Sequence, residues 1–184
     1  MKLVILDRDG VINQDADDYV KSVEEWQPIP GSIEAIAQLY QSGFTIVVAT
    51  NQSGLSRGLF DLEALESMHA KLNTLVESAG GEITAIFYCP HSPENNCNCR
   101  KPKPGLIDAI ENELSISVLG CPLVGDSIRD LQAGISKGCD PILVKTGKGA
   151  GTYRLLQQRP NPKFDDLKVF DDLAAAAHYI IENY

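Results

Sequence analysis

Two aspartates spaced two residues apart, Asp7 and Asp9, directly follow an apolar run near the start of the chain. The run, Leu3-Val4-Ile5-Leu6, is typical of a strand covered on both faces, because such a strand need not alternate apolar and polar residues. In open α/β sheets, ligands collect at the carboxyl ends of the strands. We therefore expect Asp7 and Asp9 to lie in a functional site, where carboxylates could bind a metal ion.

Three further polar groups occur at comparable places: Thr50 with Asn51, Arg100 with Lys101, and Asp126 with Asp130. Apolar runs alternate with segments whose apolar residues recur at helical spacing, which predicts a doubly wound, mostly parallel α/β sheet with right-handed crossovers. In such a sheet these groups converge at one edge. The predicted strands cover residues 3–6, 44–49, 83–88, 119–124, 141–144 and 168–170.

A second candidate site is the segment from Cys89 to Pro104, which has the spacing Cys-x-His-x₅-Cys-x-Cys. Three thiolates and one imidazole suit a closed tetrahedral Zn²⁺ site with no position left for a catalytic water. The alternative is a loop of free thiols with an incidental histidine. If zinc binds, it orders the loop that carries Arg100 and Lys101. The predicted ligands are Cys89, His91, Cys97 and Cys99.

Length and charge limit the possible classes of protein. The chain has 184 residues, which favours one domain over residues 1–184 that includes the zinc loop at 89–104. The formal charge of −9 disfavours bulk binding to nucleic acid or to anionic membranes. No apolar run approaches a membrane span, and the sequence begins without a signal peptide, so we expect a cytoplasmic protein. We also expect a monomer.

Taken together and in order, four motifs resemble those of the haloacid dehalogenase (HAD) superfamily of phosphatases. Each motif alone is weak, but each follows a predicted strand and the set spans most of the chain. The resemblance implies a Rossmann-like HAD fold, and the short segment after Asp9 indicates that no separate cap domain is present. The matching residues are Asp7-Arg8-Asp9-Gly10-Val11, Thr50, Lys101 and Gly125-Asp126-Ser127-Ile128-Arg129-Asp130.

The resemblance also implies roles for these residues. Asp7 is the expected nucleophile that forms an aspartyl-phosphate, and Asp9 the expected acid and base. Thr50 would donate its hydroxyl to the phosphoryl group, and Lys101 would supply a fixed positive charge. A catalytic Mg²⁺ is implied because a carboxylate must approach a phosphate of like charge. The expected magnesium ligands are Asp7, Asp9 and Asp126.

Within the superfamily, the chain looks like the D-glycero-D-manno-heptose 1,7-bisphosphate 7-phosphatases, which are cytoplasmic enzymes of bacterial nucleotide-heptose synthesis. The histidinol-phosphate phosphatases are close kin. The resemblance implies a phosphorylated sugar as substrate. Ala16-Asp17-Asp18 departs from the family pattern, in which a histidine and a glycine commonly precede the tyrosine. The expected substrate contacts are Asp15, Tyr19, Thr50, Asn51, Gln52, Ser53, Arg57, Arg100 and Lys101.

Several alternatives remain open at this point. A histidinol-phosphate phosphatase would use the same Asp7 and Asp9, and a nucleic-acid 3′-phosphatase shares some of the motifs. A signalling receiver also has a phosphoacceptor aspartate, a threonine and a lysine, but an acid/base at Asp9 favours loss of the phosphate. The second phosphate of a bisphosphate could bind Arg57 or the glycine-rich loop around Lys145, Gly147 and Lys148. His69 and His178 are expected to be surface or packed residues.

Overall fold

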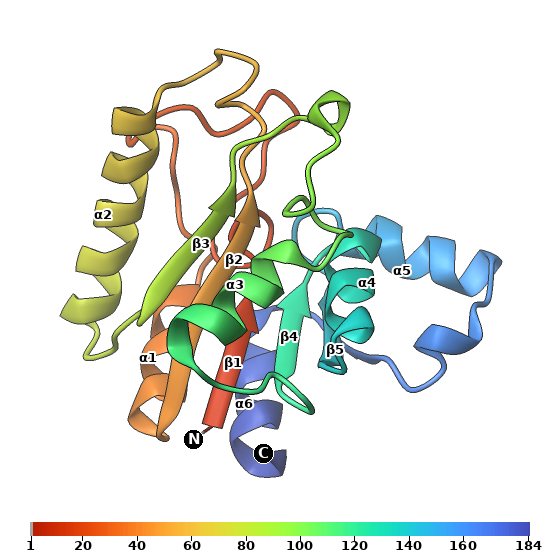
Figure 1. Ribbon diagram of the computed structural model, residues 1–184. Helices are drawn as coiled ribbons and strands as arrows, with labels where there is room; N and C mark the ends of the chain where they lie inside the picture. Colours follow the sequence, from red (N-terminus) through yellow and green to blue (C-terminus); the bar gives the residue numbers. More distant parts are fainter. Residues whose placement is uncertain (1) are drawn as a thin grey trace.

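The computed structural model describes residues 2–184, and these residues form one six-stranded sheet with helices on both of its faces (Figure 1). The strands lie in the order β3-β2-β1-β4-β5-β6, and every neighbouring pair is parallel. The doubly wound α/β fold predicted from the sequence is therefore confirmed. The strands are β1 Lys2–Leu6, β2 Phe44–Asn51, β3 Ala85–Cys89, β4 Pro122–Gly125, β5 Asp140–Val144 and β6 Lys168–Phe170.

Helices connect the strands and cover the sheet. Within residues 2–184 they are α1 Ser32–Gln41, α2 Leu62–Ser78, α3 Gly105–Leu114, α4 Ile128–Ser136, α5 Gly149–Gln158 and α6 Leu173–Asn183. Two short 3₁₀ helices, Pro93–Asn95 and Pro162–Phe164, lie in connecting loops. No helix in this described part of the chain is long and apolar enough to span a membrane.

The continuous apolar run of β1 follows from its central position in the sheet. Val4 and Leu6 pack into a core with α1, α2 and α6, whereas Leu3 and Ile5 pack into a second core with α3 and α4. Successive side chains of a strand point to opposite faces, so a strand buried on both faces needs apolar residues at every position. The central strand is thus held from both sides, and its carboxyl end is fixed in space.

The fourth strand is shorter than the sequence predicts. The apolar run suggests residues 119–124, but β4 begins at Pro122. Leu119 is 78% exposed, and Gly120 has a φ of +71°, a conformation that turns the chain and is incompatible with a strand. The predicted start at residue 119 is therefore wrong, because Leu119 is an apolar residue that lies in a turn.

The segment between β1 and α1 forms loops that pack on the sheet. Its Val11, Ile12 and Trp26 side chains are fully buried in the same core as α1 and α2. Since these residues belong to the main core, the segment is part of the sheet domain's packing and not a separate cap, as predicted. Residues 15–17, 19 and 20 of this segment line a cavity at the carboxyl ends of β1, β2 and β4.

Candidate functional site

The polar groups that follow the strands converge at the carboxyl edge of the sheet. Asp7 follows β1, Thr50 and Asn51 end β2, and Asp126 follows β4. Together they line a cavity of about 360 Å³, to which the loop between β3 and α3 contributes Lys101. The cavity is also lined by the other predicted substrate contacts, Asp15, Tyr19, Gln52, Ser53, Arg57 and Arg100.

Lys101 is a buried cation at the centre of this edge. Its Nζ lies 2.9 Å from Asp7 Oδ1 and 2.6 Å from Asp130 Oδ1, and it donates to the Ala49 carbonyl at 2.7 Å. Burial opposes the charge, but Asp130 and Asp7 raise the pKa of Lys101 above its usual value. The ammonium therefore has acceptors for all three of its protons and remains charged at any physiological pH.

The first turn of α4 fixes the position of Asp130. The backbone N–H and the hydroxyl of Ser127 donate to Asp130 Oδ2 at 3.0 and 2.6 Å, which closes a capping box. Burial disfavours the ionised form, yet the Lys101 ammonium and these hydrogen bonds hold the pKa of Asp130 below its usual value. A Cβ at Gly125 would lie 2.3 Å from Asp130 Cβ, so only glycine leaves room for this carboxylate.

Three carboxylates crowd around this single buried ammonium. Oxygens of Asp7, Asp126 and Asp130 all lie within 4.8 Å of one another. Burial and the neighbouring Asp130 raise the pKa of Asp7, and the same two causes raise the pKa of Asp126 to about 7. This excess of negative charge, made of hard oxygen donors, is chemistry that suits a divalent cation such as Mg²⁺.

The Asp9 carboxylate lies among hydrogen-bond donors and is not part of this carboxylate group. Asp9 Oδ1 accepts from Asn13 Nδ2 and Arg8 Nη2, each at 2.9 Å, and Asp9 Oδ2 accepts from Gln52 Nε2 at 2.8 Å. Burial opposes ionisation, but the Arg8 guanidinium and these hydrogen bonds lower the pKa of Asp9. Asp9 is not among the three clustered carboxylates, and its predicted ligand role stays a prediction.

Residues at the end of β2 contact both Asp9 and the loop that carries Lys101. Gln52 Nε2 also donates to the hydroxyl oxygen of the buried Thr50, at 2.9 Å. Asn51 makes two hydrogen bonds with the main chain of Lys101: its Nδ2 donates to the Lys101 carbonyl at 3.1 Å, and its Oδ1 accepts from the Lys101 N–H at 3.0 Å. The Asn51 side chain therefore orients the loop that supplies the lysine.

The rim of the cavity carries most of the remaining charge. Lys148 Nζ lies 3.2 Å from Asp15 Oδ2, and Arg57 lies 3.7 Å from Glu94. Arg129 lines the cavity as well. Lys145, which the sequence suggested as a phosphate contact, instead pairs with Asp171 at 3.0 Å and is not part of the cavity lining.

The predicted zinc ligands come together behind the cavity. Cys89 Sγ lies 3.6 Å from Cys97 Sγ and 3.1 Å from Cys99 Sγ, and His91 Nδ1 lies 3.3 Å from Cys99 Sγ. A tetrahedral zinc with bonds of about 2.3 Å would separate its sulfur ligands by about 3.8 Å. The four donors fit such an ion, and Arg100 Nη1 donates to the His91 carbonyl at 3.3 Å.

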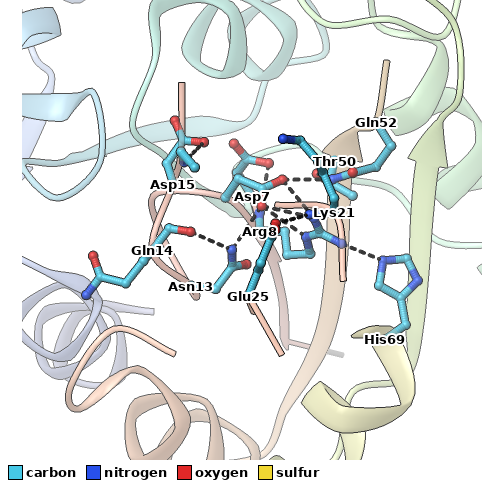
Figure 2. A network of polar contacts seen from close by, with 12 residues as sticks. Asp7, Arg8, Asn13, Gln14, Asp15, Lys21, Glu25, Thr50, Gln52 and His69 are labelled. Carbon is cyan, nitrogen blue, oxygen red and sulfur yellow. Dashed lines mark hydrogen bonds and ion pairs between the residues drawn. The ribbon is translucent and has the colours of Figure 1, made fainter. Parts of the chain in front are cut away.

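Several residues of the site escaped the sequence analysis. Arg8, inside the first motif, and Asn13, two residues after it, are fully buried, although their types favour the surface. His69 contacts Arg8 from α2, and Figure 2 shows the imidazole at the far end of the guanidinium. The sequence contains a pattern that places His69 on the inward face of its helix, because it stands at helical spacing with the apolar Leu65 and Leu72.

Comparisons with known proteins agree with this geometry. The HAD-hydrolase-like family model matches residues 98–176, and the polynucleotide kinase 3 phosphatase model matches residues 2–130. The chain is 53% identical over 180 residues to the D-glycero-beta-D-manno-heptose-1,7-bisphosphate 7-phosphatase of Pseudomonas aeruginosa, with 98% of each chain covered. It is 52% identical to the enzyme of the same name from Neisseria meningitidis, with 99% of this chain and 96% of the relative covered.

Two solved structures are also similar. The D,D-heptose 1,7-bisphosphate phosphatase of Bordetella bronchiseptica, crystallised with magnesium and phosphate, matches with a TM-score of 0.93 and 49% identity over all of both chains. The corresponding protein from Burkholderia thailandensis matches with a TM-score of 0.76 and 42% identity, again over all of both chains.

The carboxylate group predicts how Mg²⁺ should stabilise the protein. The pKa of Asp126 in the folded protein, about 7, exceeds the ordinary value of 3.8. Metal-free protein therefore gains stability from the bound proton at low pH and loses it as the pH rises through about 7. Mg²⁺ competes with that proton, so we expect it to raise the melting temperature more at about pH 8 than at about pH 5.5.

Calorimetry with and without Mg²⁺ at the two pH values measures this difference. In Asp126→Asn, Mg²⁺ should hardly change the melting temperature at either pH. Asp165→Asn, a matched change at an exposed carboxylate, should behave as wild type. An equal Mg²⁺ effect at both pH values, or an undiminished effect in Asp126→Asn, would contradict this assignment.

Proposed function

Because this chain belongs to the D-glycero-β-D-manno-heptose-1,7-bisphosphate 7-phosphatase family of HAD-like phosphatases, we propose that it hydrolyses the 7-phosphate of heptose 1,7-bisphosphate. The observation that carries the proposal is the position of Lys101, whose ammonium lies against Asp7 and is held there by Asp130. A carboxylate that contacts a fixed cation in an open cavity is equipped to attack a phosphoryl group.

The negative charge of the substrate makes such cations necessary. Two unit charges of the same sign about 4 Å apart repel by roughly 4 kcal/mol at an effective dielectric constant of about 20. The Lys101 ammonium reduces this repulsion between Asp7 and the phosphate. Asp7 and Asp126 would hold Mg²⁺, which when bound neutralises phosphoryl oxygens and orients the group. The donor set around Asp126 fits this ion.

In the first step, an Asp7 oxygen attacks phosphorus and the bond between phosphorus and the sugar oxygen breaks. Asp9 gives a proton to the leaving alkoxide, so that the products are the sugar and an aspartyl-phosphate on Asp7. In the second step, Asp9 takes a proton from water as the water attacks phosphorus. Inorganic phosphate leaves, and Asp7 returns to its starting state.

The contacts of Asp9 bear on where that proton comes from. Burial opposes ionisation, but Arg8, Asn13 and Gln52 hold the pKa of Asp9 low in the free protein. Phosphate monoesters lose their second proton near pH 6, so part of the substrate enters as the monoanion. We infer that the substrate brings the proton that Asp9 passes to the leaving oxygen.

The far end of a bisphosphate needs a second cationic region. Arg57, Arg100, Arg129 and Lys148 line the cavity, and of these Lys148 is paired with Asp15 and Arg57 with Glu94. We propose that Arg100 and Arg129 bind the distal phosphate, with Asp15 and Tyr19 beside the sugar. This charge pattern supports a small phosphorylated sugar more than a nucleic acid, since the whole chain carries a formal charge of −9.

We further propose that Cys89, His91, Cys97 and Cys99 hold a structural Zn²⁺, on the support of their mutual distances. Its effect on activity would be indirect. Lys101 comes two residues after Cys99, and Arg100 donates to the His91 carbonyl, so a fixed metal loop fixes both cations. We also propose that residues 1–184 act as a single domain, as a monomer, in the cytoplasm.

Purified protein with Mg²⁺ should release phosphate from D-glycero-D-manno-heptose 1,7-bisphosphate with a higher kcat/KM than from histidinol phosphate. Asp9→Asn should lower kcat/KM for the bisphosphate by about 10²- to 10⁴-fold, because the alkoxide then leaves without a proton. A phosphate-release assay measures both quantities. Faster hydrolysis of histidinol phosphate would favour the kindred enzyme, and retention of a stable phosphoprotein would favour a signalling receiver.

Elemental analysis of protein purified without chelator should find about one zinc per chain. Cys97→Ser should lose the metal, lower the melting temperature and reduce kcat/KM by at least about tenfold, because Arg100 and Lys101 lose their fixed positions. Cys121→Ser is the matched control, since Cys121 lies beside Cys139, is not one of the four clustered donors and should leave the zinc content unchanged. Protein without zinc but with full activity would refute the proposed metal loop.

A further inference from the structure

The Arg8 guanidinium is a buried cation that contacts the acid/base residue directly. Its side chain is 1% exposed, and its Nη2 lies 2.9 Å from Asp9 Oδ1 and 3.1 Å from Asp9 Oδ2. Asn13 and Gln52 each contact only one of these oxygens. Arg8 therefore constrains the plane of the Asp9 carboxylate in a way that neither amide does.

The other end of the guanidinium meets His69. Arg8 Nη1 lies 3.2 Å from His69 Nε2. A guanidinium has only donors and does not lose its charge, so His69 Nε2 must accept and the ring proton must be on Nδ1. Burial, together with the neighbouring Arg8 charge, lowers the pKa of His69 to about 4. The imidazole is thus a neutral acceptor with one defined tautomer.

Helix α2 holds this acceptor in place. Leu65, Met68 and Leu72 of the helix are fully buried in the core, and the His69 ring packs against the Tyr88 ring of β3 with 6.0 Å between centroids. Because dense packing restricts side-chain movement, these contacts limit how far the imidazole can shift if the guanidinium moves. The contact thus connects Asp9, through Arg8, to helix α2, which carries the imidazole (Figure 2).

We propose that His69 is a positioning residue for proton transfer, which accepts a hydrogen bond from Arg8 and so keeps Arg8 aligned on the Asp9 carboxylate. The inference rests on the proposed phosphatase function, in which Asp9 protonates the leaving oxygen as the bond from phosphorus to that oxygen breaks. His69 itself touches neither the substrate nor the reacting atoms. Its effect should therefore depend on how much the leaving group needs the proton.

Two substrates separate this role from a merely structural one. The sugar alkoxide is strongly basic and needs a proton to leave, whereas the p-nitrophenolate of p-nitrophenyl phosphate leaves readily without one. The ratio kcat/KM reports steps up to the first irreversible one, which is here the departure of the alcohol or phenol. Misplacement of Asp9 should thus lower kcat/KM for the sugar far more than for the aryl ester.

We expect His69→Leu, which removes the acceptor, to lower kcat/KM for the heptose bisphosphate by about 10- to 100-fold and that for p-nitrophenyl phosphate by less than about threefold. His69→Gln keeps an acceptor oxygen and should recover most of the loss. His178→Leu makes the same exchange at an exposed histidine of α6 and should match wild type on both substrates. Circular dichroism establishes that each variant is folded.

Equal losses on the two substrates, no loss on either, or a His69→Gln variant as poor as His69→Leu would overturn the role of His69. Wild-type protein that releases no phosphate from either substrate would instead overturn the proposed function.

A measurement on the unmodified protein is independent of variant folding. Nitrogen-15 shifts of the three histidines should show His69 with its proton on Nδ1 between about pH 5 and 8, and a proton on Nε2 would exclude the contact.

Discussion

The contact of one buried ammonium with two carboxylates governs this site. Lys101 joins the end of β1, through Asp7, to the start of α4, through Asp130, and it reaches both from the loop that carries the cluster of Cys89, His91, Cys97 and Cys99. Three elements distant in the sequence must therefore be placed correctly before the contact can form. The buried charges still do not balance, because Asp126 adds a further carboxylate. A site with this deficit of positive charge favours ligands that bring cations, and a phosphate with Mg²⁺ meets that condition.

The two aspartates of the first motif differ because the protein surrounds them differently. Asp7 faces other carboxylates, and burial together with Asp130 raises its pKa. Asp9 faces only donors, and its pKa is lowered although burial opposes this. Pairs of titratable groups with pKa values pushed apart are typical of sites that assign them different tasks. The difference arises from the groups around each carboxylate: Asp130 and Asp126 lie near Asp7, whereas Arg8, Asn13 and Gln52 donate to Asp9.

Much of this arrangement could be predicted from the sequence, because it depends on periodicity and order. The apolar runs gave the strands of the sheet, and parallel strands bring their carboxyl ends to one edge, so Asp7, Thr50 and Asp126 had to meet. The Cys and His spacing predicted the four-residue cluster.

What could not be predicted depends on packing in three dimensions. Which of Lys145 and Lys148 faces the cavity, and which polar side chains accompany Arg8 into the core, are set by contacts between residues far apart in the chain. The opposite case is Leu119, an apolar residue that the sequence pattern places in a buried strand but that lies exposed in a turn.

The proposed mechanism requires that Asp7, held by Lys101, receives the phosphoryl group. Rapid acid quenching of the Asp9→Asn variant after mixing with p-nitrophenyl phosphate, followed by peptide mass spectrometry, tests it most directly. In this variant the base that activates water is missing, so the intermediate should accumulate. If Asp7 is the acceptor, the variant gives a burst of nitrophenol with one phosphoryl group per active chain, located on Asp7. Nitrophenol release without any phosphorylated peptide, or a phosphoryl group on another residue, would contradict it.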